Sequence, residues 1–141
     1  MRRAGVRNRT RVKMDIGLFI FRLGIALTML FYHGIPKFEL LISGDEIQFA
    51  DPVGMGIVAS FLLATFAEFL CSILVLTGLW TRLAALILTA NMVVATFVHL
   101  STMPFDEPTK QLAFLFMLGF AMIAVSGAGG LSLDRFLLRR S

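Results

Sequence analysis

The stretch VGMGIVASFLLATFAEFLCSILVLTGL, residues 53–79, decides the fold. It holds one acidic residue, Glu68, and no basic residue. A helix needs about 20 predominantly apolar residues to cross the hydrocarbon core of a bilayer, and this stretch is longer than that. A membrane-spanning strand would alternate polar and apolar side chains, which these residues do not do. We therefore expect a membrane-spanning helix here.

Three further stretches are apolar over a comparable length: residues 16–32, 83–100 and 111–126. The four prolines fall between the four stretches, where a missing N–H interrupts no helical hydrogen bonding. The sequence therefore predicts an all-α fold, an integral membrane four-helix bundle over residues 15–137. Basic tails precede and follow this domain at residues 1–14 and 138–141.

The composition excludes most soluble classes of protein. Of the 141 residues, 57% are hydrophobic and only 16% are charged, and the mean hydropathy is +0.84. A soluble domain would be nearer to one quarter charged. The single cysteine, Cys71, forms no disulfide within the chain and belongs to no Cys-x-x-Cys redox motif. No residue set typical of a metal site is present either.

The net charge of +4 is concentrated at the ends of the chain, which argues for membrane topology and against nucleic-acid binding. Ten of the thirteen basic residues lie in the N-terminal tail, at Arg82, or near the C-terminus. Basic segments stay in the cytoplasm. We therefore expect both termini to be cytoplasmic in a bacterial cytoplasmic membrane. The acidic loop 33–52 between the first two helices then faces outward; it is apolar enough to fold onto the bundle as short interfacial helices, with breaks at Gly44 and Pro52.

Three polar residues lie at membrane depth: Arg22, Glu68 and Asn91. A charge at this depth needs a partner or a function. At about 1.5 Å per residue, the long side chain of Arg22 reaches the height of Glu68. The sequence predicts a buried Arg22–Glu68 ion pair with Asn91 as its hydrogen-bond partner. Two interpretations stay open: a polar contact that fixes helix register, and a proton relay or ligand pocket.

A second polar group is expected at the outer rim of the bundle, where Tyr32, His33, His99 and Lys110 lie near helix ends. Three interpretations stay open for it. These side chains are interfacial anchors, or the histidines bind a quinone head group and exchange protons with it, or they are axial ligands to a haem.

Several segments together resemble the DoxX family of small four-helix bacterial membrane proteins. The matching segments, in order along the chain, are Arg22-Leu23-Gly24, Tyr32-His33-Gly34-Ile35-Pro36-Lys37, Phe49-Ala50-Asp51-Pro52-Val53-Gly54, Ala67-Glu68, Gly78-Leu79-Trp80-Thr81-Arg82-Leu83-Ala84 and Ser132-Leu133-Asp134. The chain departs from the family pattern at Thr109, where an acidic residue usually precedes the lysine, and at the turn Gly127-Ala128-Gly129-Gly130.

The resemblance implies a cytoplasmic-membrane protein linked to redox metabolism, with no covalently bound cofactor and with quinone as the candidate ligand. The family name comes from subunits of a quinol oxidase and of a thiosulfate:quinone oxidoreductase. No catalytic residue is carried over to this chain, and whether the chain is itself an enzyme stays open.

Three hypotheses for the function follow. The first is an accessory or quinone-interacting subunit of a membrane redox or oxidative-stress system, in contact with lipid and with other membrane or redox subunits or further copies of itself. The second is a non-catalytic assembly subunit that binds protein partners. The third is a small-solute or proton carrier, which with four spans would need an oligomer.

Overall fold

The computed structural model of the chain describes residues 2–102 and 108–138, with the side chains of residues 2–9, Lys110 and Leu138 left aside. The described residues form helices and turns, with no strand among them. The basic C-terminal tail expected at residues 138–141 lies almost wholly outside the described residues.

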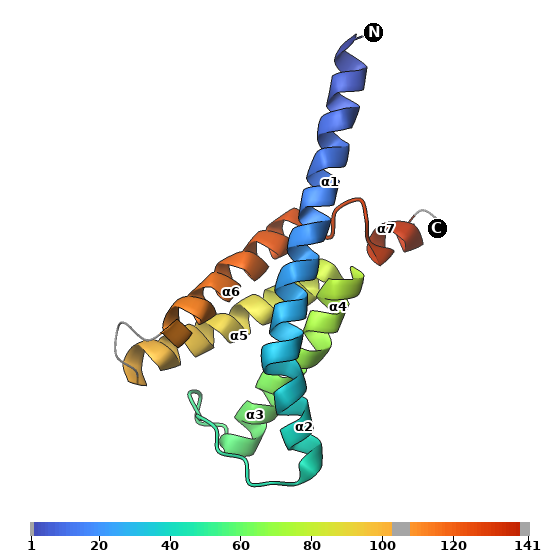
Figure 1. Cartoon of the computed structure of the whole chain (residues 1–141). Helices are drawn as coiled ribbons and strands as arrows, with labels where there is room; N and C mark the ends of the chain where they lie inside the picture. The colour runs from blue at the N-terminus through green and yellow to red at the C-terminus, as the bar shows by residue number, and fades with distance from the viewer. Residues whose placement is uncertain (1, 103–107, 139–141) are drawn as a thin grey trace.

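The first long helix combines three segments: α1 (Arg2–Met29), the π-helical segment η1 (Leu30–Gly34) and α2 (Ile35–Ser43). Figure 1 shows them as one rod that extends beyond the other helices at its N-terminal end. The expected end of the first helix at residue 32 was therefore wrong, because the helix continues through Pro36 to Ser43, whereas the expected helical structure after residue 33 and the break at Gly44 are present. A proline inside a helix removes one backbone hydrogen bond and crowds the preceding turn. The wider π-helical turn directly before it accommodates the ring.

A second composite helix returns along the first one. It consists of α3 (Ile57–Thr65), the π-helical segment η2 (Phe66–Cys71) and α4 (Ser72–Thr77). Gly78, with a φ of 77°, ends it. A tight turn leads into α5 (Thr81–Thr102), which pairs with α6 (Pro108–Ser126), and the short helix α7 (Leu133–Leu138) follows.

Three of these helices are long and apolar enough to cross a membrane: Thr10–Ser43, Ile57–Thr77 and Thr81–Thr102. The apolar part of α6, Gln111–Ser126, is shorter. Over the described residues the chain is thus all-helical, with three helices of membrane-spanning length and composition, and the fourth span stays a prediction. Below, the terminal end is the end near Asp15 and Asp134, and the loop end is the end at residues 44–56.

The helices pack through a core in which small side chains alternate with large ones. The buried members of this core come from the three long helices and α6: Ala26, Met29, Cys71, Val75, Ala84, Ala85, Leu88, Met92, Phe116, Phe120 and Ile123. Small residues let helix backbones approach closely, which is how helices associate in lipid. Many large apolar side chains point outward, as expected of a surface that contacts acyl chains.

Candidate functional site

The candidate site forms where the two π-helical segments pack against each other. Gly34 at the end of η1 lies against the backbone of Glu68 in η2. One turn further along, the rings of Phe38 and Phe69 stack with their centroids 4.4 Å apart. This close approach brings the side chains on one face of the first helix up to Glu68. π-helical turns within α-helices are frequent at functional sites.

Glu68 is buried, with 4% of its surface exposed, and both of its carboxylate oxygens accept hydrogen bonds. The ammonium group of Lys37 donates to Oε2 and forms an ion pair with it. The amide Nδ2 of Asn91 donates to Oε1 over 3.0 Å. The predicted association of Glu68 with Asn91 is present, and the cation that completes it is Lys37. The Lys37 ammonium also lies 5.9 Å from the centroid of the Phe49 ring.

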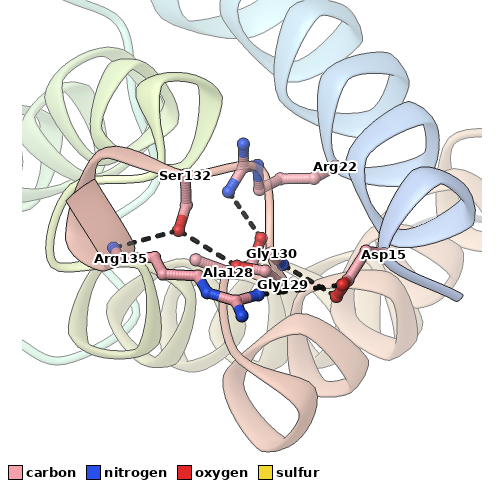
Figure 2. A network of polar contacts seen from close by, with 7 residues as sticks. All are labelled: Asp15, Arg22, Ala128, Gly129, Gly130, Ser132 and Arg135. Atoms are coloured by element: carbon pink, nitrogen blue, oxygen red, sulfur yellow. Dashed lines mark hydrogen bonds and ion pairs between the residues drawn. The ribbon is translucent and has the colours of Figure 1, made fainter. Parts of the chain in front are cut away.

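The predicted Arg22–Glu68 ion pair was wrong, because Arg22 points toward the terminal end. Its Nη1 and Nη2 atoms donate to the carbonyl oxygens of Ala128 and Leu131, each over 2.8 Å. Figure 2 shows the guanidinium directed at the turn between α6 and α7. Arg22 is buried, with 2% of its surface exposed. The carbonyl groups of Ala128 and Leu131 lie in the turn between α6 and α7, outside both helices, and Arg22 donates one hydrogen bond to each of them.

The same turn is held to the first helix by a second set of contacts (Figure 2). Asp15 accepts a hydrogen bond from the backbone N–H of Gly130 over 2.8 Å, and its other oxygen lies 3.8 Å from Nη1 of Arg135. We call the set Asp15, Arg22, Gly130 and Arg135 the terminal clasp. It joins the first helix to the turn before α7 and to α7 itself, segments that lie far apart in the sequence.

Asp134 extends this connection to the start of α5. Its carboxylate accepts hydrogen bonds from the backbone N–H groups of Trp80 and Thr81, over 2.8 and 3.1 Å, and from the Thr81 hydroxyl over 3.0 Å. Free N–H groups at a helix start attract a carboxylate. Asp134 therefore caps α5 from a separate segment of the chain.

The outer polar group predicted at the loop end is only partly brought together. His33 and His99 both line a cavity of about 250 Å³, which Lys37, Glu68 and Asn91 also line. Tyr32 does not line it and is 76% exposed, which fits an outward-facing anchor. The side chain of Lys110 lies outside the described residues. Glu68 and Asn91 of the predicted inner group and His33 and His99 of the predicted outer group thus line the same cavity.

The cavity combines apolar walls with a few converging polar groups, the usual composition of a small-molecule site. The apolar walls come from α3, α5, α6 and the loop before α3, and include Leu63, Ala64, Met92, Val94, Ala95, Val98, Leu112, Ala113 and Phe116. The His33 ring meets the Phe116 ring edge to face at 5.7 Å. The Nδ1 atom of His99 is buried and has no hydrogen-bond partner within the described protein. A buried polar atom of this kind indicates space for a ligand or water.

The loop before α3 forms the wall of the cavity at the loop end. Phe49, Pro52 and Val53 line the cavity, and the Phe49 ring contacts the Phe61 ring edge to face at 5.4 Å. Asp51 fastens this loop to α3. Its carboxylate accepts hydrogen bonds from the Ser60 hydroxyl and from the backbone N–H groups of Met55 and Gly56. The Ser60 hydroxyl, with the Gly56 amide, holds the pKa of Asp51 below its ordinary value.

The residues present fit a neutral ring that carries carbonyl oxygens. Lys37, Asn91 and the two imidazoles are donors for such oxygens, and the apolar walls accept the ring faces. Among the described residues, no three His, Cys, Asp or Glu side chains are placed to hold a metal ion.

Sequence reasoning missed Lys37, Phe49, Asp51 and Ser60 as parts of this site. For Lys37 a signal was present: it follows His33 by four residues, the spacing that places two side chains on one helix face. Ending the first helix at residue 32, with Pro36 between the apolar stretches, hid that signal. For Phe49 the sequence offers no comparable signal, because a loop has no fixed periodicity.

Comparison with known proteins agrees with the resemblance over the segments from Arg22 to Ala84, whereas Ser132-Leu133-Asp134 lies beyond the matched range. A search of curated proteins and a search of solved structures gave no match. The DoxX family profile matches residues 17–100, more than half of the chain. The matched range runs from the first helix to one residue after His99, so it includes Glu68, Lys37 and Asn91. The chain belongs to the DoxX family.

Proposed function

We propose that this protein is a multi-pass subunit of the bacterial cytoplasmic membrane that binds a quinone on behalf of a membrane redox system. One observation carries the proposal: the apolar cavity into which His33, Lys37, Glu68, Asn91 and His99 converge. A quinone supplies two-electron chemistry that also takes up two protons. Electrons would come from a partner subunit that holds the redox centre.

The residues of the cavity have distinct roles in this proposal. The unpartnered Nδ1 of His99 forms a hydrogen bond to one quinone oxygen. His33 lies close enough to Glu68, Lys37 and His99 to interact electrostatically with each, and in this proposal its imidazole is the group that exchanges a proton with the ligand. The Lys37–Glu68 pair and Asn91 fix the positions of the polar groups before the ligand arrives.

The topology belongs to the same proposal. We infer four spans, with Gln111–Ser126 as the fourth, and both termini in the cytoplasm. The distribution of basic residues supports this arrangement. A span of the length of Gln111–Ser126 is accommodated by local thinning of the bilayer at modest cost. The cavity then lies in the outer half of the membrane.

The proposal is tested by native mass spectrometry of the protein extracted gently from its own membrane. We expect a quinone-sized adduct on the wild-type protein and on Tyr32→Phe, a matched control next to His33 that does not line the cavity. His99→Leu and Glu68→Gln should lose the adduct while they still insert and stay folded. An adduct equally abundant in all four proteins would contradict the site. Absence of any such adduct from the wild type would contradict the function.

The assembly-subunit hypothesis remains the second candidate because one observation favours it: both carboxylate oxygens of Glu68 already bind protein groups. Under this hypothesis Glu68→Gln lowers the stability of the bundle, no small molecule is lost, and a protein partner remains attached at fixed stoichiometry. The same spectra report both outcomes. A carrier would instead show Glu68-dependent flux into liposomes.

A further inference from the structure

A second hollow lies at the terminal end of the bundle, away from the cavity beside Glu68. It measures about 730 Å³ and is bounded by the start of α5, the turn after α6 and the short helix α7. The two spaces share no described lining residue. Residues 78–84 and 132–134, two of the segments that carry the family resemblance, meet here through the hydrogen bonds of Asp134. The proposed function uses neither segment.

With α5 across the membrane, this hollow lies at the level of the lipid head groups. Residues 80–83, at the beginning of α5, form part of its wall. The 22 residues of α5 are apolar enough to cross a membrane and measure about 33 Å along the helix axis. Because the hydrocarbon core is about 30 Å thick, the first turn of α5 lies at one edge of that core. Trp80 is 67% exposed, as is usual for tryptophan at this level.

Arg82 brings to the hollow a cation with which no described carboxylate forms an ion pair. Its guanidinium lies against the backbone of Gly127, where an added Cβ would be 3.0 Å from Nε of the arginine. Its Nη2 donates to the carbonyl oxygen of Val125 over 3.5 Å, which is long for a hydrogen bond. A guanidinium has five N–H donors. Within the described residues, donors of Arg82 therefore remain for an anion.

Arg135 of α7 supplies a second guanidinium to the same hollow. Its ion pair with Asp15 is long, at 3.8 Å, and its side chain is 44% exposed. Exposed pairs of this kind are weak, so Arg135 is available to a further anion. The carboxylate of Asp134 also lines the hollow, but it is held by three hydrogen bonds from the start of α5. Those bonds occupy the backbone N–H groups of the helix start, which leaves the two arginine side chains as the groups that bind an anion.

Trp80 borders the hollow in a strained backbone conformation. Its φ is 48°, in the left-handed region that bulky residues rarely adopt. The Asp134 carboxylate accepts a hydrogen bond from its backbone N–H and so helps to hold this conformation. Strained residues concentrate at functional sites. The strain at Trp80 is a second observation, independent of charge, that marks this hollow.

We propose that the hollow binds the phosphate group of an anionic phospholipid. The phosphate accepts hydrogen bonds from Arg82 and Arg135, because the planar guanidinium group matches the geometry of phosphate oxygens. The acyl chains follow the outward face of α5, where Leu83 and Leu86 are 52% and 59% exposed. Basic pockets between helices at the membrane surface recognise lipid head groups in this way. The proposal is independent of the quinone function.

The test compares a phosphatidylglycerol with the phosphatidylcholine that carries the same acyl chains. Each lipid is titrated into the lipid-free, full-length protein in one detergent. Adducts are counted by native mass spectrometry, and the emission of Trp80, the single tryptophan of the chain, is followed in parallel. Inorganic phosphate is titrated separately, as the same chemical group without acyl chains.

Arg82→Gln removes the cation that has no carboxylate partner. Arg11→Gln is the matched control, because it removes the same charge from an exposed position on the first helix that does not line the hollow. Arg135→Gln serves as the second variant if Arg82→Gln does not fold.

We expect wild type and Arg11→Gln to bind one phosphatidylglycerol alike, about tenfold more tightly than phosphatidylcholine. Arg82→Gln and Arg135→Gln should lose most of this preference, with the affinity for phosphatidylcholine unchanged. Equal losses in Arg82→Gln and Arg11→Gln would overturn the site, because the attraction would then belong to the basic surface as a whole. Equal affinity of the wild type for both lipids would also overturn it. Binding of inorganic phosphate as tight as that of phosphatidylglycerol would overturn the lipid as the ligand.

Discussion

A Cβ atom added to Gly34 would lie 2.5 Å from the backbone carbonyl oxygen of Glu68 and 2.9 Å from the carbonyl carbon. Both contacts are with backbone, which cannot move aside as a flexible side chain does. The distance between η1 and η2 is therefore set by the absence of a side chain at position 34. His33 and Lys37 reach the cavity because the first helix lies this close to Glu68.

Gly34→Ala should accordingly destabilise the bundle by about 1–3 kcal/mol through overpacking and weaken ligand binding at the cavity. The matched control is Gly24→Ala in the same helix, where nothing lies within 4 Å of the added Cβ. That substitution should be neutral or stabilising by up to about 1 kcal/mol, because alanine favours helix more than glycine does. Unfolding in mixed detergent micelles measures both changes. Equal effects of the two substitutions would contradict the close packing.

Double-mutant cycles distinguish the observed partner of Glu68 from the partner that the sequence suggested. Lys37→Met and Glu68→Gln should be coupled by about 1–3 kcal/mol, because each removes one half of the same ion pair. Arg22→Met and Glu68→Gln should add within about 0.5 kcal/mol, because these side chains share no partner. Coupling of Arg22 with Glu68 as strong as that of Lys37 would contradict the terminal clasp.

The stability of the loop before α3 should depend on pH through the ionisation of Asp51. Its folded pKa lies below the ordinary value of about 3.9. The hydrogen bonds to Ser60, Met55 and Gly56 therefore stabilise the loop fully above that pH, and this stabilisation is lost as the pH falls through the folded pKa. Amide hydrogen exchange at Met55 and Gly56, corrected for intrinsic rates, should show protection that disappears in this acid range.

Asp51→Asn should show weakened protection of these amides at neutral pH and little further change in acid. Asp45→Asn is the control, because the described structure shows no hydrogen bond or ion pair of the Asp45 carboxylate. A wild-type protection pattern in Asp51→Asn would mean that the loop is held by its apolar contacts alone.

Asp134 should stabilise the turn between α4 and α5, although it is distant from that turn in the sequence. Asp134→Ala removes three hydrogen bonds at the start of α5 and should cost about 1–2 kcal/mol of stability, as loss of a helix cap does. Asp134→Asn keeps one acceptor oxygen and should cost less. Trp80 fluorescence reports the change locally, because the backbone N–H of Trp80 is one of the donors. An unchanged emission spectrum and stability in Asp134→Ala would contradict this cap.

The positions of the apolar helices could be read from hydropathy alone, because each long apolar run needs a helix to satisfy its backbone in lipid. The hydrogen-bond and ion-pair partners of the polar residues could not be read from hydropathy. Depth arithmetic gave Arg22 and Glu68 comparable heights, but it contained no information on the direction in which each side chain points. It also took no account of carbonyl oxygens in a turn more than 100 residues away, which bind Arg22. The sequence analysis placed Pro36 outside the first helix. The helix continues through it because a π-helical turn accommodates a proline that a regular helix would not.

The pairing of Lys37 with Glu68 also determines which molecules the cavity excludes. Among the described lining residues these two carry the permanent charges, and they cancel. The pair therefore contributes no net charge that could attract an ion into the pocket. An anion such as thiosulfate or sulfite would have to separate Lys37 from Glu68 and leave a carboxylate unpaired in a medium of low dielectric constant. An uncharged ring would enter without breaking that pair, so we expect the pocket to select against ionic solutes by charge.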